Sequence, residues 1–582
     1  MKKIIEILRT KKSVHYIIII VIGLLISIPF IWLQIRDTQD GWLHVLRVQG
    51  VNYSLAESSF PFLVAPYYCC DWGYAMVAFY QTIVTYVPYL LGLISGSVIW
   101  GIKLFAVLTT ILSGIFMYNF VNEVTKKKAI ALFAAIFYMC FPYKLEVIYH
   151  RFAIGEFTAL AFIPLVFQGL YNLLHGDRNK HYYIAIGATV LMLSHSISTE
   201  YTAIFCAVYI LFNIKLFFNK DVIKKCVINV VFILLISSMF ILPIIEFETS
   251  AHYAIFDPDI MRTTTDHLAY YSIEPWQFLK DKQEEDPISF IVGIPFIITL
   301  MLGLFAYKKI PKKNKNFYIT CIILGVVAMW MCTTLFPWKI FPDFMGTLQY
   351  PWRLLGFAYF FLIPICSINL YYTLQYLKNR NARYTLYTIS ILILLAFTAR
   401  ELSVYKSEDI KLDEKYLGIV IENPRIHYFS INREYLPEKA INEQRGYLND
   451  RTNATYVISG EAEIVNEIKE DLHLELELRN VKKDTELELP YLYYPGYTVV
   501  LQYNNNEIQL DTKESDYGFV KITIPENISE GRITVDYTAT VLDKAAYIIS
   551  GIALVGFVIY VIIFRITVNK QKSLIEGEEN RR

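Results

Sequence analysis

This chain of 582 residues lacks the short motifs with which soluble enzymes bind nucleotides and metals. It has no glycine-rich phosphate loop, no GxGxxG turn and no HExxH helix, so nucleotide-dependent and zinc-protease chemistry has no recognisable basis. No CxxC pair or histidine-rich spacing suggests a zinc site. The net charge of +1 gives no argument for nucleic-acid binding.

Charge and cysteine are also scarce. Only 18% of the residues are charged, against about a quarter in soluble domains, whereas 55% are hydrophobic and the mean hydropathy is +0.38. We therefore expect most of the chain to lie in a lipid bilayer. The eight cysteines stand mostly alone within apolar runs, and the adjacent pair Cys69 and Cys70 is poorly placed to form a disulfide with itself.

Apolar runs long enough to cross a bilayer recur along the chain. The first follows a basic N-terminus and has no small-residue cleavage site after it, so we interpret it as a retained span. The predicted spans fall at roughly 15–35, 98–121, 128–142, 157–174, 181–197, 200–217, 225–244, 288–307, 317–336, 352–377, 383–400 and 545–566.

One further apolar run, 76–94, is ambiguous, and the positive-inside rule decides how to interpret it. If this run does not cross, basic loops such as TKKK (125–128) and KKIPKKNKN (308–316) all lie inside the cell. If it crosses, they all move outside. We therefore interpret 76–94 as re-entrant or interfacial, and we predict about twelve spans with both termini in the cytoplasm.

The segment 401–544 differs from the rest, because charged residues become frequent and strand-like alternation begins. LHLELELR (472–479) alternates leucine with polar residues, and YTVVLQYNNNEIQLD (497–511) is typical of two strands joined at an asparagine turn. We predict an extracytoplasmic, all-β, sandwich-like domain of seven or eight strands. Its function is either contact with carbohydrate or cell wall, or that of a structural lid.

The sequence thus predicts a polytopic α-helical membrane protein with a terminal β-domain and a final transmembrane helix. The predicted boundaries are a helical membrane domain at 1–400 with outer loops at 36–97 and 245–287, a linker at 401–449, the β-domain at 450–544, the last transmembrane helix at 545–566 and a cytoplasmic tail at 567–582.

Polar residues that could carry chemistry gather on the predicted outer face. Asp40, His44 and Arg47 follow i, i+4, i+7 spacing, so they share one face of a helix just beyond the first span. A carboxylate there suits a general base, and arginines suit a phosphate, which they bind in bidentate geometry. The same outer loop adds Asp37 and Asp71, and other outer segments add His150, Arg151, Glu156, His195 and Arg353.

A plainer interpretation is that these charges only pair with one another at the membrane boundary, Arg47 with Asp40 and Arg151 with Glu156. A structural role likewise explains His195, which stands in a polar turn. Acidic and basic groups side by side also fit a divalent metal that bridges carboxylate and phosphate, although no ligand spacing indicates one.

The chain resembles the GT-C glycosyltransferases, polytopic membrane enzymes that take sugars from polyprenyl-phosphate carriers on the outer face. The shared features are an acidic residue just beyond the first span, a long first outer loop and a terminal outer β-domain. More narrowly, it looks like a bacterial group of YfhO-type membrane proteins. The segments that carry this narrower resemblance are DGWLHVLRVQG (40–50), YHRFAIGEF (149–157), LSHSIST (193–199), LQYPWRLLGF (348–357) and LPYLYYPGYTV (489–499).

The resemblance implies roles for the candidate residues. In GT-C enzymes the acidic residue after the first span acts as catalytic base or metal ligand, which here indicates Asp40, with Asp37 as the alternative. A divalent metal, Mg or Mn, is a candidate cofactor. The chain lacks the paired acidic start and the acceptor motifs of protein O-mannosyl and oligosaccharyl transferases, which argues against protein glycosylation. The other assignments are Arg47, His44, Arg151 and Arg353 to the donor phosphate, and Glu156, His150, His195 and Asp71 to acceptor or metal.

The leading hypothesis is a GT-C-type glycosyltransferase of the bacterial cell membrane. It would transfer a hexose or pentose from a polyprenyl-phosphate donor to a cell-envelope glycan, lipid or glycopolymer. The first alternative, a transporter or flippase for a lipid-linked saccharide, is less favoured because the spans are nearly free of ionisable residues. The second is a non-catalytic envelope assembly protein, which would tolerate the neutralisation of every outer carboxylate.

Overall fold

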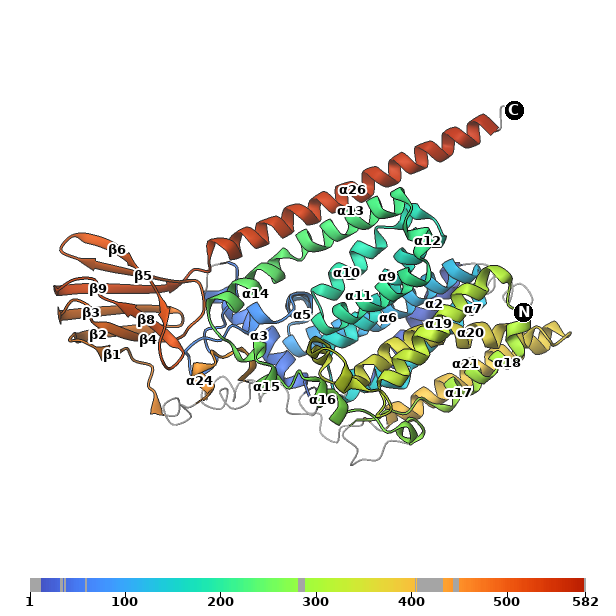
Figure 1. Cartoon of the computed structure of the whole chain (residues 1–582), viewed down its shortest axis with the longest axis horizontal. Coiled ribbons are helices and arrows are strands. Elements are labelled where there is room, and N and C mark those ends of the chain that lie inside the picture. Colours follow the sequence, from blue (N-terminus) through green and yellow to red (C-terminus); the bar gives the residue numbers. More distant parts are fainter. Residues whose placement is uncertain are drawn as a thin grey trace.

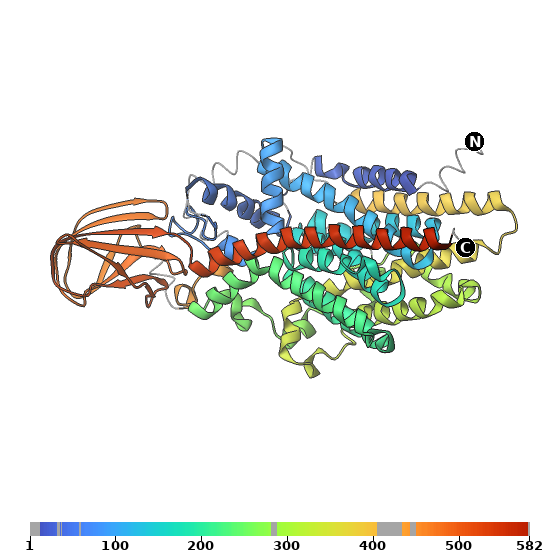
Figure 2. The ribbon, with the colours of Figure 1, turned by 90° about the horizontal axis from the view of Figure 1, so that it is seen from above.

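A long helical body with a β-domain at one end makes up the computed structural model of the chain (Figure 1). The structure describes residues 12–31, 35, 38–57, 60–280, 288–403, 405, 433–442 and 450–579. The helix α2 (Lys12–Ile26) begins, and α26 (Val541–Glu579) ends, at the end of the body opposite the β-domain (Figures 1 and 2). This placement fits the prediction that both termini lie on one side of the membrane, and the sidedness itself stays a prediction.

Six helices in the described part of the chain are long and apolar enough to cross a bilayer. Two more candidate spans are bent: α7 with the segment that follows it by 45°, and α13 with α14 by 64°. The six are α6 (Val98–Thr125), α9 (Ile154–His175), α19 (Lys312–Met331), η10 with α20 (Pro351–Leu374), α21 (Arg380–Ser403) and α26, and the bent pairs are α7 (Lys128–Cys140) with Pro142–His150 and α13 (Lys220–Ile236) with α14 (Ser238–Ser250).

The remaining predicted spans coincide with shorter elements, so the predicted number of about twelve is not confirmed. The run 76–94 forms α4 (Met76–Phe79) and α5 (Ile83–Ser95); the 13 residues of α5 fall short of the roughly 20 that a crossing needs. The other short elements of the body are η1 (Ile28–Ile31), α8 (Pro142–Leu145), the π-helical turn η3 (Glu146–His150), η4 (Arg178–Lys180), α10 (Tyr183–Met192), α11 (Ser196–Phe212), α12 (Ile214–Phe217), α17 (Ile294–Met301), α18 (Gly303–Ala306) and η7 (Tyr307–Lys309).

The outer segments are also partly helical. The predicted helical face that carries Asp40, His44 and Arg47 belongs to α3 (Gly41–Glu57), which begins immediately after Asp40. The further outer elements are η5 (Ala254–Phe256), α15 (Pro258–Met261), α16 (Thr265–Tyr270), η6 (Pro275–Leu279), η8 (Trp338–Ile340), η9 (Asp343–Leu348), η11 (Arg433–Tyr435) and α24 (Lys439–Asn442).

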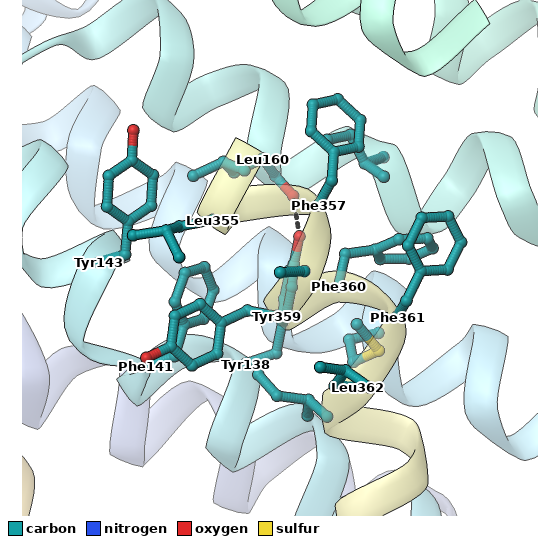
Figure 3. Close-up of a cluster of buried hydrophobic side chains, with 14 of the residues drawn as sticks. Tyr138, Phe141, Tyr143, Leu160, Leu355, Phe357, Tyr359, Phe360, Phe361 and Leu362 are labelled. Carbon is teal, nitrogen blue, oxygen red and sulfur yellow. Dashed lines mark hydrogen bonds between the residues drawn. The ribbon is translucent and has the colours of Figure 1, made fainter. Parts of the chain in front are cut away.

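Three helices, α7, α9 and α20 (Leu355–Leu374), pack around a core rich in aromatic side chains (Figure 3). Tyr138 on α7 donates its hydroxyl hydrogen to the carbonyl of Leu160 on α9 at 2.7 Å. Gly356 lets α20 approach α9 closely, because a Cβ at this position would lie 2.5 Å from Leu160 Cδ2. This contact holds together the N-terminal parts of the two helices. Glu156 lies at the start of α9, and Arg353 lies just before α20.

The C-terminal β region that the sequence predicts is confirmed, with nine strands in place of seven or eight. They form two antiparallel sheets, ordered β1-β4-β8-β7 and β2-β3-β9-β5-β6. The leucines of LHLELELR point inward, as the alternation predicts. The strands are β1 (Tyr456–Ser459), β2 (Glu463–Glu470), β3 (His473–Val481), β4 (Glu486–Leu492), β5 (Tyr497–Tyr503), β6 (Asn506–Leu510), β7 (Lys513–Glu514), β8 (Phe519–Thr523) and β9 (Ile528–Tyr537).

The β-domain is docked on the first outer loop. Buried residues of segment 62–79 belong to the same hydrophobic cluster as the core of the two sheets. Trp72 packs edge-on against Phe519, and its carbonyl accepts a hydrogen bond from the backbone of Leu492 at 3.0 Å. This shared core fixes the position of the β-domain beside the segments that surround the cavity described next.

Candidate functional site

A cavity of about 1530 Å³ opens where the helical body meets the outer loops and segment 433–442. Elements far apart in sequence form its wall, and most of the predicted site residues face it. Asp37 lies outside the described residues. The predicted residues that line the cavity are Asp40, His44, Arg47, Arg151, Glu156, His195 and Arg353.

A buried carboxylate between two arginines forms the charged part of the wall. Glu156 Oε2 accepts a hydrogen bond from Arg151 Nη1 at 2.9 Å and lies 3.7 Å from Arg353 Nε. Tyr143 donates its hydroxyl hydrogen to the other oxygen, Oε1, at 2.5 Å. Glu156 stands in the first turn of α9, where the helix dipole favours a negative charge. Since two guanidinium groups share one carboxylate, this cluster has one positive charge in excess.

Further contacts hold Arg353 in place. Its Nη1 donates to the carbonyl of Leu348 at 3.0 Å and to Gln349 Oε1 at 2.9 Å. Gln349 has a φ of +61°, a strained backbone for a residue with a side chain, and strain of this kind tends to occur at functional sites. Arg353 is therefore held rigidly just before the start of α20.

The carboxylate of Asp40 remains available. Its backbone N–H donates to the carbonyl of Arg151 at 2.8 Å, and the N–H of Gln39 donates to that of His150 at 3.1 Å. These bonds join the first outer loop to the second and hold Asp40 at the start of α3. In the described part of the chain no basic group lies within 4 Å of its carboxylate, so the pair with Arg47 that the sequence suggested is not formed.

Arg47 contacts a segment that the sequence interpretation treated as a linker. Its Nη2 lies 2.6 Å from Glu434 Oε1 and 3.0 Å from the hydroxyl oxygen of Tyr435. The guanidinium also lies 3.7 Å from the centre of the Tyr80 ring. No local signal pointed to Glu434 or Tyr435, because they follow Arg47 by nearly 400 residues and stand in a segment without clear periodicity.

Two histidines of the wall are uncharged at neutral pH. Burial, together with the positive charge of Arg47, lowers the pKa of the His44 imidazole well below its ordinary value. Burial and then the charge of Arg353 lower the pKa of His195 to about 3. His195 Nδ1 also accepts the backbone N–H of Ser198 at 3.2 Å, which caps the start of α11. The suggested structural role of His195 is therefore present, alongside its position on the cavity wall.

Two predicted site residues lie elsewhere. His150 does not line the cavity, and its Nδ1 lies 2.5 Å from Oε1 of the buried carboxylate Glu146. Asp71 lies at the junction with the β-domain, where its carbonyl accepts a hydrogen bond from Lys469. Arg151 next to His150 lines the cavity, whereas His150 is the last residue of a π-helical turn. Asp71 stands in a loop of positive-φ residues.

A resident divalent metal at this site stays a prediction. No group of three or more His, Cys, Asp or Glu side chains in this part of the chain is arranged to hold an ion. Both oxygens of Glu156 already accept hydrogen bonds from Tyr143 and Arg151. The carboxylate of Glu156 is therefore not free to complete a metal site with Asp40.

Long apolar helices indicate a membrane protein, and the cavity beside the β-domain is its candidate functional site. No family model matches the chain. An uncharacterized protein of Lactococcus lactis subsp. cremoris (strain MG1363) is 24% identical to it over 590 residues, with 94% of each chain covered.

Two solved structures of an Archaeoglobus fulgidus protein are remotely similar, each at 12% identity. The oligosaccharyltransferase in its apo form aligns with a TM-score of 0.45 over 70% of this chain and 58% of that one. The oligosaccharyltransferase AglB in complex with an inhibitory peptide and a dolichol-phosphate aligns with a TM-score of 0.40 over the same shares. This chain thus spans less than two thirds of the length of these structures.

Proposed function

We propose that the chain is a GT-C-type glycosyltransferase of the bacterial cell membrane, with both termini in the cytoplasm and the β-domain outside. It transfers a sugar from a polyprenyl-phosphate donor to a glycan, lipid or glycopolymer of the cell envelope. The observation that carries the proposal is the available Asp40 carboxylate in the same cavity as the buried cluster of Arg151, Glu156 and Arg353.

The arrangement suits a single displacement at the anomeric carbon. Asp40 takes the proton of the acceptor hydroxyl as that oxygen bonds to the anomeric carbon. The bond from this carbon to the phosphate oxygen breaks, and the polyprenyl phosphate leaves with the electron pair. Arg353 and Arg151 stabilise the negative charge that develops on the leaving phosphate, because hydrogen bonds hold both guanidinium groups in place before the reaction. Glu156 keeps the two guanidinium groups in place.

Charge balance favours a carrier with one phosphate. The cluster of two arginines and Glu156 has one positive charge in excess, the charge of Asp40 acts on Arg151, and Glu434 already pairs with Arg47. A sugar phosphodiester brings one negative charge to this site. A diphosphate carrier would bring a second, for which the described wall offers no further buried cation. The proposed reaction routes no step through a metal.

The test is turnover of polyprenyl-phosphate hexoses and pentoses by the full-length protein in lipid nanodiscs, with a cell-envelope extract as the acceptor source. We expect Asp40→Asn to lower turnover by about 100-fold or more, the usual contribution of a general base. Asp37→Asn tests the alternative base. Asp516→Asn, at an exposed position of the β-domain, is the matched control and should retain full turnover.

Two further results of the same experiment separate the alternatives. Turnover that persists in a metal chelator would agree with the absence of a metal step. Binding without turnover, unchanged in the Asp40 and Asp37 variants, would contradict the enzyme and favour transport or assembly.

A further inference from the structure

Besides Nε of Arg353 in the charged cluster, three buried polar atoms on the cavity wall have no hydrogen-bond partner in the described part of the chain. They are Nδ1 of His44, Oε1 of Gln81 and Nε1 of Trp352. The three residues are only 3%, 8% and 7% exposed, and all of them line the cavity. The set comprises a pure acceptor in Gln81, a pure donor in Trp352 and an imidazole nitrogen that serves as either.

Such atoms are rare in folded proteins, and they point to a ligand. Buried polar groups are nearly always paired, and leaving one unpaired costs about 1–3 kcal/mol. In a closed core this cost would remain. Here the three atoms border an open cavity, so that a bound molecule with both donor and acceptor groups can satisfy them.

The rest of each side chain is already held in place. Gln81 Nε2 donates to Ser196 Oγ at 2.7 Å, which fixes the amide and leaves its oxygen as the available atom. The Trp352 ring stacks on Tyr350 with 4.4 Å between ring centres and an angle of 17°. The His44 ring lies 5.5 Å from that of Tyr80. Groups preorganised in this way bind without losing much side-chain freedom.

The ligand groups that match these atoms are uncharged. His44 is neutral, and neither an amide nor an indole carries a charge. Each buried cation of the described wall already faces a carboxylate: Arg47 faces Glu434, and Arg151 and Arg353 share Glu156. Arg262, the remaining arginine of the lining, is exposed at the edge of the cavity. A second acidic group on the ligand would therefore find no buried cation.

We propose that His44, Gln81 and Trp352 form a subsite for the hydroxyl groups of an uncharged sugar, and that this subsite rejects sugar acids. Each sugar hydroxyl is both donor and acceptor, so it can pair with any of the three atoms. The aromatic rings of Tyr350 and Tyr271 beside Trp352 provide apolar surface for the C–H groups of the sugar ring. The inference rests on the proposed function and specifies its substrate class.

The experiment compares three probes that share one farnesyl phosphodiester and differ only in what it carries: a methyl group, a neutral hexose or a hexuronic acid. Binding to the full-length protein in nanodiscs is measured by calorimetry, with empty nanodiscs as the baseline. We expect the hexose to bind about 10-fold or more tightly than the methyl probe, since a hydrogen bond contributes about 0.5–1.5 kcal/mol and 1.4 kcal/mol is tenfold. The hexuronate should bind no better than the methyl probe.

Two variants assign this preference to the subsite. Trp352→Phe retains an aromatic ring but loses the N–H group, and Gln81→Met retains the length of the side chain but loses its oxygen. Each should lower the ratio of hexose to methyl affinity by about 3-fold to 10-fold. Trp276→Phe is the matched control, because Trp276 is 59% exposed and does not line the cavity. Thermal unfolding of each variant verifies that it is folded.

The failures of the two proposals are distinguishable. Equal affinity for the hexose and methyl probes, tight binding of the hexuronate, or an unchanged ratio in folded Trp352→Phe would overturn the sugar subsite alone. If none of the three probes binds above the empty nanodiscs, the phosphate site of the proposed function is wrong and the sugar subsite falls with it.

Discussion

Two of the buried arginine–glutamate contacts in the described part of the chain have different surroundings. In the β-domain, Arg451 lies 3.4 Å from Glu488, and both side chains are fully buried. The guanidinium is enclosed by the rings of Phe519 and Tyr456, at 4.2 Å and 4.5 Å from their centres, and donates to the carbonyl of Leu489. One cation meets one anion inside a closed core.

Beside the cavity the balance is different. Arg151 and Arg353 share the single carboxylate of Glu156 and border about 1530 Å³ of open space. Burial of an ion pair is thus not a sign of function, since both places have it. The features that distinguish the site are an excess charge and the open space beside it.

Breaking the closed pair should have the largest effect, and it should fall on stability. We expect Arg451→Met to lower the free energy of unfolding of the β-domain by about 3–5 kcal/mol, because it leaves the Glu488 carboxylate buried without its cation. The double variant with Glu488→Leu should recover most of this loss. Hydrogen exchange of the sheet amides in the full-length protein measures both. A double variant as unstable as the single one would show that the pair is not the cause.

Changes in the cluster of Arg151, Glu156 and Arg353 should instead alter the affinity for a phosphodiester. Loss of an arginine should weaken binding, and loss of the glutamate charge should strengthen it. Arg353→Gln should weaken binding of the farnesyl methyl phosphodiester by about 30-fold, since the loss of a buried charged partner costs about 2 kcal/mol or more. Glu156→Gln should strengthen it, because the excess of positive charge rises. Calorimetry at low and high salt measures both affinities. A weakening in both variants would mean that the cluster is structural, like the pair in the β-domain.

Acidification should separate the two regions as well. The lowered pKa of His195, about 3, means that the unfolded chain takes up a proton near pH 6.5 and the folded chain does not. Stability of the cavity region therefore falls as the pH drops below 6.5, by about 2 kcal/mol at pH 5 for this group. His44 acts in the same direction. His195→Gln should remove its share of this dependence.

The β-domain has a histidine with the opposite sign. The hydrogen bond from His473 to Asp536, at 2.7 Å, raises the pKa of this imidazole. Its stabilising contribution is present below the unfolded pKa of about 6.5 and is lost as the pH rises through the raised folded value. Hydrogen exchange between pH 7 and pH 5, corrected for intrinsic rates, should show α3 and α11 loosening. If β3 and β9 also loosen on acidification, and loosen no more in His473→Gln than in the wild type, the assignment is wrong.

The smallest expected effect concerns Arg47. Glu434→Gln removes the negative partner of its guanidinium while Tyr435 keeps its hydrogen bond, so the cavity gains one positive charge. We expect the farnesyl methyl phosphodiester to bind about 3-fold more tightly, with a stability loss near 1 kcal/mol. Glu438→Gln, in the same segment, is the control. Unchanged affinity in Glu434→Gln would show that Arg47 serves only to hold segment 433–442 in place.

Local patterns in the sequence were sufficient for some parts of the site. Helical spacing placed Asp40, His44 and Arg47 on one face of α3, and all three line the cavity. Leucine alternation over 472–479 predicted a strand with one buried face. Such inferences succeed because backbone geometry imposes the periods of 3.6 and 2 on neighbouring residues.

Other features depended on contacts between distant segments. No local pattern indicates that Arg47 pairs with Glu434 and not with Asp40, or that Arg151 and Arg353 share Glu156. The same is true of the 64° bend between α13 and α14. The composition and periodicity of the chain determined that it is a membrane protein with a β region and a set of charges next to its spans. Only tertiary packing decided which charges pair, which polar atoms stay unpartnered and where the cavity opens, because these depend on how far apart the packed elements lie.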